Sequence, residues 1–427
     1  MKFYRNIRTL YTPLGFRAAK GRDAMRLVQV IEQAAILCDD QGVILLAGHE
    51  EAVRRSVTGE HEVIDCRGLV ALPGFVDSHT HAVFAGDRSL EFGMRAAGKS
   101  YQEVAAAGGG IKSSVSQVRE NTLETIVEHS KRYILSALSL GTTTMEVKSG
   151  YGLHTASEIK LLQAARQLSK ITPMEIHTTF LGAHAVPHGT SQSDYVREVI
   201  EKQLPAIVAE RGLAEFIDVF CDEGYFTNEE TRAIIEAGIK TGLKPRLHVD
   251  ELADTGGAEL AVSLGCYSAD HLLRVNARGI GALASSNRTV ATLLPTTALS
   301  LRVDYAPGRK LIDAGAAVAI ATDCNPGSSM TENMQFVMTL AVIGMQLSVE
   351  EALTAATLNG AAALGLEKTH GTIEPGKQLD VVFYDIPSLA YLPYHIAVSD
   401  VVTTVKRGEI VLGEVFDSRF ERLRDTL

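Results

Sequence analysis

Residues 73–89 read PGFVDSHTHAVFAGDRS, a short apolar run that ends in two histidines separated by one residue. Side chains two positions apart on a strand point to the same face. His79 and His81 therefore project together from a strand end, where two imidazoles can bind one metal ion. An isolated H-x-H pair is weak evidence, since two such histidines can simply hydrogen-bond within a loop. The rest of the sequence decides between these interpretations.

Seven more short apolar runs follow, each rich in Val, Ile, Phe or Thr. Runs of this length and composition are typical of strands buried on both faces. The eight predicted strands are Ala71–His81, Thr142–Lys148, Met174–His184, Phe216–Glu223, Pro245–Glu251, Cys266–His271, Thr289–Pro295 and Ala316–Asp323. Segments with helical spacing separate them, several beginning at Ser, Asn or Asp and ending at Gly.

Strands and helices in alternation form parallel sheets with right-handed crossovers, and eight repeats is the number that closes a (β/α)8 barrel. An open doubly wound sheet has the same alternation and is the structural alternative. The distribution of polar residues favours the barrel, because acids and histidines recur at distant strand ends: His248 with Glu251, Asp270 with His271, and Asp323. In a closed barrel these ends meet at one mouth, whereas in an open sheet they could not all meet.

The predicted mouth offers ligands for a metal. His79, His81 and His248 supply three neutral nitrogens and Asp323 an anionic oxygen, a set that suits one zinc or ferrous ion with a position left for water. A two-metal centre usually needs a further bridging anion, such as a carboxylated lysine on a middle strand. The fourth run contains no lysine. One ion is favoured, although Lys148 on the second run leaves another arrangement open.

The chain is longer than one hydrophobic core supports, which is about 250–300 residues, so a second domain is expected. Period-two stretches occur in both flanks, for example RLVQVIE and VVTTVKRGEIVLGE. The predicted fold class is therefore α/β, with a TIM-like barrel over residues 72–366. A small β-sandwich domain is expected from residues 1–71 together with 367–427.

Composition restricts the partners and the compartment. The 51 acidic and 41 basic residues give a formal charge of −10 with no basic run, so nucleic acid and anionic membranes are poor partners. Five scattered cysteines without a C-x-x-C pair indicate a reducing compartment. The amino terminus lacks the apolar segment of a signal peptide, so a soluble cytoplasmic protein is expected. A homodimer is the expected assembly, because it is the commonest closed oligomer.

Taken together, these stretches resemble the metal-dependent amidohydrolases, and among them the imidazolonepropionase family. The resemblance covers nearly the whole predicted barrel, and the motifs that carry it are PGFVDSHTHAVFAGDRSLEF, GKSYQEVAAAGGGI, KSGYGL, FLGAHAVP, DVFCDEGYF, LHVDEL, SADHLL, LLPTTALSLR and ATDCNPGSSMTENM. H-x-H alone is shared by many amidohydrolases. Arg88, Tyr151, His184 and the D-C-N-P-G-S run together are specific to this family.

The resemblance implies a role for each matching position. Metal ligation falls to His79, His81, His248 and Asp323, and catalytic proton transfer to Glu251, His271 and Asp323, whose order the sequence leaves open. The implied contacts to substrate or product come from Arg88, Tyr151, His184, Glu251, Asn325, Gly327 and Ser328. Ser328 departs from the Thr expected in some relatives but keeps the hydroxyl.

The implied activity is hydrolysis of the cyclic amide of 4-imidazolone-5-propanoate to N-formimidoyl-L-glutamate in histidine degradation, with water activated by the metal. Its anionic substrate needs a cation, and Arg88 lies in the first loop of the catalytic face, where its guanidinium could hold a carboxylate at two points. The main alternative is a related cyclic amidase or deaminase on another ring, for which Arg88 would not be required. A non-catalytic scaffold is disfavoured because all four ligand candidates are present.

Overall fold

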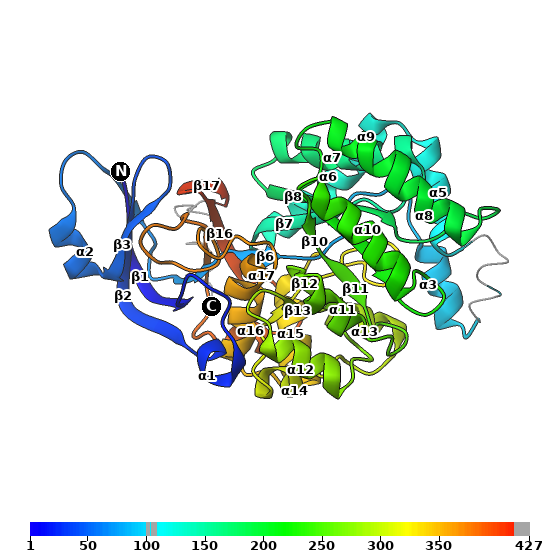
Figure 1. Ribbon diagram of the computed structural model, residues 1–427. Coiled ribbons are helices and arrows are strands. Elements are labelled where there is room, and N and C mark those ends of the chain that lie inside the picture. Colours follow the sequence, from blue (N-terminus) through cyan, green and yellow to red (C-terminus); the bar gives the residue numbers. More distant parts are fainter. Residues whose placement is uncertain (100–102, 104–108, 414–427) are drawn as a thin grey trace.

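The computed structural model describes residues 1–99, 103 and 109–413, and its two sheets lie side by side (Figure 1). Among the described residues the larger sheet has nine strands, eight of which follow the order β14-β13-β12-β11-β9-β8-β7-β6 with parallel pairing. They are β6 (Phe75–Asp77), β7 (Thr142–Lys148), β8 (Glu175–Ala183), β9 (Phe216–Cys221), β11 (Leu247–Val249), β12 (Ser268–His271), β13 (Val290–Leu293) and β14 (Val318–Ile320). The short β10 (Lys244–Pro245) pairs with β9. Each of the eight parallel strands lies within a predicted run, whereas β10 begins one residue before the fifth run.

The first and last strands meet at the carboxyl end of the sheet. Thr80 pairs with Cys324 in a parallel bridge, and the backbone N–H of His81 donates to the Cys324 carbonyl at 2.9 Å. The backbone N–H of Asp323 donates to the His79 carbonyl at 3.0 Å. The nearly closed barrel confirms the predicted fold class, and it places the two segments that carry ligand candidates against each other.

Helices cover the outside of the barrel (Figure 1). Those along the first half are α3 (Ser89–Ala96), α5 (Ile111–Glu120), α6 (Leu123–Ser139), α7 (Thr155–Ile171), α8 (Gln192–Glu198), the π-helical turn η1 (Val199–Gln203), α9 (Leu204–Ala209) and α10 (Asn228–Lys240). Those along the second half are α11 (Gly257–Ser263), α12 (Ala277–Ser285), α13 (Pro295–Leu301), α14 (Gly308–Asp313), α15 (Met334–Met345), α16 (Val349–Ala356) and α17 (Leu358–Ala363). Within the described residues no helix is long and apolar enough to cross a membrane.

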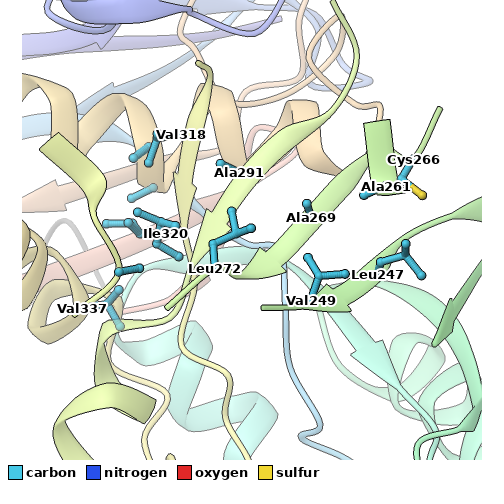
Figure 2. Close-up of a cluster of buried hydrophobic side chains, with 14 of the residues drawn as sticks. Leu247, Val249, Ala261, Cys266, Ala269, Leu272, Ala291, Val318, Ile320 and Val337 are labelled. Atoms are coloured by element: carbon cyan, nitrogen blue, oxygen red, sulfur yellow. The ribbon is translucent and has the colours of Figure 1, made fainter. Parts of the chain in front are cut away.

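The hydrophobic core lies between the barrel wall and these helices. Leu247 and Val249 of β11 are fully buried and belong to the core cluster that also contains Val337 of α15 (Figure 2). His248 lies between them in sequence, so the alternation of a strand turns its side chain to the barrel interior. The same alternation along neighbouring strands builds an apolar outer layer and a polar interior.

Both chain ends contribute to the smaller sheet, as predicted. Its order is β17-β16-β15-β5-β1-β2-β3, and β4 pairs with β1, so all eight strands belong to one hydrogen-bonded and mainly antiparallel sheet. The strands are β1 (Lys2–Pro13), β2 (Val28–Cys38), β3 (Ile44–His49), β4 (Glu62–Asp65), β5 (Val70–Pro73), β15 (Val381–Tyr384), β16 (Val401–Lys406) and β17 (Glu409–Leu412). Of three further short helices, α2 (Glu50–Ser56) packs on β2 and β3. The other two, α1 (Gly21–Met25) and α18 (Tyr391–Tyr394), pack on barrel helices, α1 on α14 and α16 and α18 on α15.

The first predicted strand contains two structural strands. Leu72 and Pro73 of β5 pair with β15 in the small sheet, and β6 begins at Phe75 in the barrel. Gly74 lies between them, and a Cβ there would come within 2.3 Å of Thr143 Oγ1. The chain thus passes from one sheet to the other where only a glycine fits. The division into domains at residues 71/72 and 366/367 stays a prediction.

Candidate metal centre and substrate pocket

Three histidines from distant segments meet at the carboxyl end of the barrel. His79 and His81 follow β6, and His248 is the central residue of β11. One ring nitrogen of each lies within 4.8 Å of the others, and all three side chains are buried. The Nε2 atoms of His81 and His248 are 3.4 Å apart. The structure therefore brings the three predicted nitrogen ligands together.

Asp323 adds an oxygen to this cluster. Its Oδ1 lies 3.5 Å from His79 Nε2 and 3.7 Å from His81 Nε2. Its other oxygen accepts a hydrogen bond from Thr297 Oγ1 at 2.6 Å, which orients the carboxyl group. Burial raises the pKa of Asp323 to about 6. A divalent cation beside the carboxyl group would favour its ionised form.

The donor set fits a divalent ion. His79 Nε2 is buried and has no hydrogen-bond partner. Burial, with Lys148 nearby, holds the pKa of His79 well below its usual range, and burial does the same for His81. Both rings are therefore neutral, the form in which imidazole binds metals. Three such nitrogens with one carboxylate oxygen match the sets that zinc and ferrous iron take.

A cavity of about 590 Å³ opens over the cluster. Its lining includes every predicted site residue except His79, which lies beneath with no exposed surface. These residues are His81, Arg88, Tyr151, His184, His248, Glu251, His271, Asp323, Asn325, Gly327 and Ser328. Residues far apart in the sequence thus share one pocket.

One wall of the pocket is aromatic. The His184 ring stacks on His81 with centroids 5.1 Å apart and planes 16° from parallel. Its Nδ1 lies 3.0 Å from the Gly150 carbonyl, so this nitrogen carries the proton and donates. Burial lowers the pKa of His184 to about 3, which keeps the ring neutral. The Tyr151 ring lies 5.6 Å from His81 and 5.5 Å from His184. Flat rings of this kind suit a planar substrate.

Glu251 and His271 lie together beside the cluster, with the His271 ring 5.2 Å from that of His248. Glu251 Oε2 is 3.5 Å from His271 Nδ1, and the backbone N–H of Glu251 donates to Asp222 Oδ2 at 2.7 Å. Burial, followed by the nearby Asp323, raises the pKa of Glu251 to about 8. Glu251 is therefore protonated at neutral pH and available as a proton donor.

Arg88 is held by a residue that the sequence interpretation missed. Its Nε and Nη2 donate to the two oxygens of Glu91 at 2.8 and 2.6 Å. Glu91 also accepts from the Gly110 backbone N–H at 2.7 Å. The forked edge of the guanidinium is thus already occupied, and Nη1 faces Gly327, where a Cβ would lie within 2.3 Å of it. The R-x-x-E spacing at the start of α3 was the available indication.

The loop after Asp323 is shaped by Asn325. Its side-chain oxygen accepts from the backbone N–H groups of Gly327 and Ser328, each at 2.8 Å. Its amide nitrogen donates to the Asp323 carbonyl at 2.6 Å. Both ends of the Asn325 side chain therefore bind within the loop, and this arrangement turns Gly327 and Ser328 toward the pocket.

The comparisons with known proteins agree with this fold. A model of the amidohydrolase family matches residues 70–411. Guanine deaminase from E. coli has a TM-score of 0.71 at 18% identity, covering 97% of this chain and 99% of its own. A zinc-bound adenosine deaminase from Xanthomonas campestris has a TM-score of 0.71 at 16% identity, covering 100% and 98%. The chain belongs to the amidohydrolase family.

Sequence relatives narrow the assignment. Imidazolonepropionase from Porphyromonas gingivalis is 44% identical over 96% of this chain and 97% of its own. The Clostridium tetani enzyme is 44% identical over 95% and 97%, and the Geobacillus kaustophilus enzyme 42% over 96% and 98%. Within the amidohydrolases, the chain belongs to the imidazolonepropionase family, as its motifs predicted.

Proposed function

We propose that this enzyme hydrolyses 4-imidazolone-5-propanoate to N-formimidoyl-L-glutamate in histidine degradation. The observation that carries the proposal is one pocket that combines a metal-ligand cluster with an arginine, Arg88, at its mouth. Relatives named imidazolonepropionase match almost the full chain, which supports the same substrate. A deaminase of a neutral base would not need this cation to bind its substrate, although the guanidinium also pairs with Glu91.

The reaction adds water to the ring carbonyl carbon and breaks the bond from that carbon to the ring nitrogen. The carbon becomes a carboxylate, and the nitrogen takes up a proton. A divalent ion held by His79, His81, His248 and Asp323 would acidify the attacking water and polarise the carbonyl. The residues around it must then accept one proton and deliver another.

Glu251 is suited to deliver the proton. Its carboxyl group is neutral at pH 7 because its pKa is raised to about 8. Asp323 and His271 line the same cavity and are the candidates to accept the proton of water. His184 and Tyr151 would pack against the planar ring, and Ser328 would offer a hydroxyl to its polar edge.

The activity is tested with purified protein and freshly prepared imidazolone propionate. Loss of the ultraviolet absorbance of the ring, together with the appearance of N-formimidoyl-glutamate, supports the proposal, and bound metal is measured on the same sample. A protein that contains metal, leaves this substrate unchanged and deaminates a neutral ring would show that the alternative function is correct.

Arg88→Met is expected to weaken binding of substrates that carry the propionate. A hydrogen bond to a charged group contributes about 1–3 kcal/mol, so KM should rise roughly 5- to 150-fold. An analogue without the propionate should bind both proteins equally. Arg302→Met, an exposed arginine at the end of α13, is the matched control and should leave KM unchanged. Equal losses on both substrates would contradict the role of Arg88.

The proposal also covers the metal, the compartment and the assembly. We infer one zinc or iron ion for each subunit, because three imidazole nitrogens and one carboxylate oxygen suit either metal. The five cysteines are buried and unpaired, which supports a reducing, cytoplasmic location. We further propose a homodimer with a small anionic substrate as its ligand, the commonest closed assembly being a dimer.

A further inference from the structure

A layer of buried charges lies inside the barrel beneath the candidate ligands. It contains three carboxylates and two cations on inward positions of β7, β9, β11 and β12 or directly before them: Glu146, Lys148, Asp218, Arg246 and Asp270. All five side chains are fully buried and leave a formal sum of −1. Burying so many charges costs free energy relative to an apolar interior. A contribution to stability therefore does not explain why the barrel contains this layer.

Asp270 contacts the first histidine ligand. Its Oδ2 lies 2.7 Å from His79 Nδ1, and a carboxylate can only accept, so His79 donates from Nδ1. The proton is thereby fixed on that nitrogen. His79 Nε2 keeps its lone pair, has no hydrogen-bond partner, and faces Asp323. This is the form of the ring that binds a metal.

Asp218 lies beside the third ligand. Its Oδ1 accepts the backbone N–H of His248 at 3.1 Å. Its Oδ2 lies 3.0 Å from His248 Nδ1, a close contact between a carboxylate and a ring nitrogen without the angle of a hydrogen bond. One carboxylate thus holds the strand and places an acceptor next to the ring nitrogen. The opposite nitrogen of His248 faces His81.

Each of these carboxylates has a buried cation. Lys148 Nζ lies 2.9 Å from Asp218 Oδ2 and 2.9 Å from Glu146 Oε1. Arg246 Nη2 donates to Asp270 Oδ2 at 3.1 Å and to the Ser78 carbonyl at 2.6 Å. Because Ser78 precedes His79, Arg246 fixes the backbone of that ligand as well as the carboxylate that orients its ring.

We propose that Asp270 and Asp218 are positioning residues, which hold His79 and His248 with Nδ1 protonated and Nε2 directed at a divalent ion. Arg246 and Lys148 serve as their fixed counter-ions. This inference rests on the metal site of the proposed function. It concerns the affinity and geometry of that site, and it is independent of the substrate.

The test measures Zn²⁺ affinity of the full chain after metal removal, by competition with a chromophoric chelator. Asp270→Asn and Asp218→Asn should each bind Zn²⁺ about 10- to 100-fold more weakly than wild type. Asp250→Asn is the matched control, since Asp250 is equally buried at the same barrel end but accepts from Thr255, Gly257 and Ala258 instead of a ligand. Its Zn²⁺ affinity should stay unchanged. Wild-type affinity in both test variants would overturn the proposal.

A measurement on the wild-type protein covers the case in which the variants do not fold. In ¹⁵N-histidine-labelled, metal-free protein, NMR should assign the protons of His79 and His248 to Nδ1. Protonation of Nε2 in both rings would overturn the proposal. Weakened Zn²⁺ binding by the variants together with a wild-type enzyme inactive on imidazolone propionate would contradict the proposed function and leave this inference standing.

Discussion

Replacing His248 by alanine is expected to remove the bound divalent ion and reduce turnover to background while the barrel stays folded. The substitution deletes one of three nitrogens that lie within 4.8 Å of one another. Loss of a residue that only supports a ligand costs about 10- to 100-fold in metal affinity, and loss of the ligand itself should cost more. Without the ion, water keeps its ordinary pKa and is a poor nucleophile at pH 7.

The fold should survive this substitution for a local reason. Asp218 would lose the imidazole but keep Lys148 at 2.9 Å and the backbone N–H of residue 248. Leu247 and Val249, on the outer face of β11, are unchanged. Metal content is measured by elemental analysis, turnover by the ultraviolet assay and folding by circular dichroism.

The control for this experiment is His154→Ala. His154 is an exposed histidine directly before α7 and is not a member of the metal-ligand group. It should retain both metal and activity. A metal-free His248→Ala protein that turns over at the wild-type rate would show that hydrolysis does not depend on this cluster.

The barrel could be predicted because its strands are parallel and buried on both faces. Such strands appear in sequence as short apolar runs, and β7 coincides with its predicted run, Thr142–Lys148. The passage at Gly74 could not be predicted, because β5 and β6 read as one continuous apolar run. Only tertiary structure shows that Thr143 packs against this glycine. The longest strand of the small sheet, β1, was also missed because polar residues interrupt its pattern.

The metal ligands could be predicted because strand ends converge in a barrel. The H-x-H motif also places two of the ligands, His79 and His81, next to each other in the sequence. Of the charges beneath them, Asp270 was found in the same way, but the two cations were not. Lys148 is the last residue of its predicted run and Arg246 the second residue of its own, and a charge at such a position resembles an exposed strand end. Their indication was period two: Glu146 precedes Lys148, and Arg246 precedes His248, by two positions, so each pair shares a face.

Glu251→Gln is the substitution expected to affect chemistry most while leaving the metal in place. Glu251 is not a member of the metal-ligand group, so metal content should stay at the wild-type level. Its amide cannot donate a proton as an acid, and loss of general acid catalysis typically costs about 10²- to 10⁴-fold. The loss of rate should appear in kcat and not in KM, because glutamine has the same size as glutamate and fills the same space.

The pH dependence of kcat is a second test of Glu251 as the proton donor. Burial and Asp323 raise the pKa of Glu251 to about 8, so the carboxyl group holds its proton below that pH and loses it above. If Glu251 delivers the proton to the leaving nitrogen, wild-type kcat should fall as pH rises through about 8. The Glu251→Gln enzyme should lack this fall in kcat at alkaline pH.

The control is Glu223→Gln, because Glu223 is an exposed carboxylate just after β9. This variant should keep both the wild-type rate and the alkaline limb of the pH profile. A Glu251→Gln enzyme with wild-type kcat and an unchanged limb would assign the proton donor to another residue, and His271, 3.5 Å away, would be the next to test.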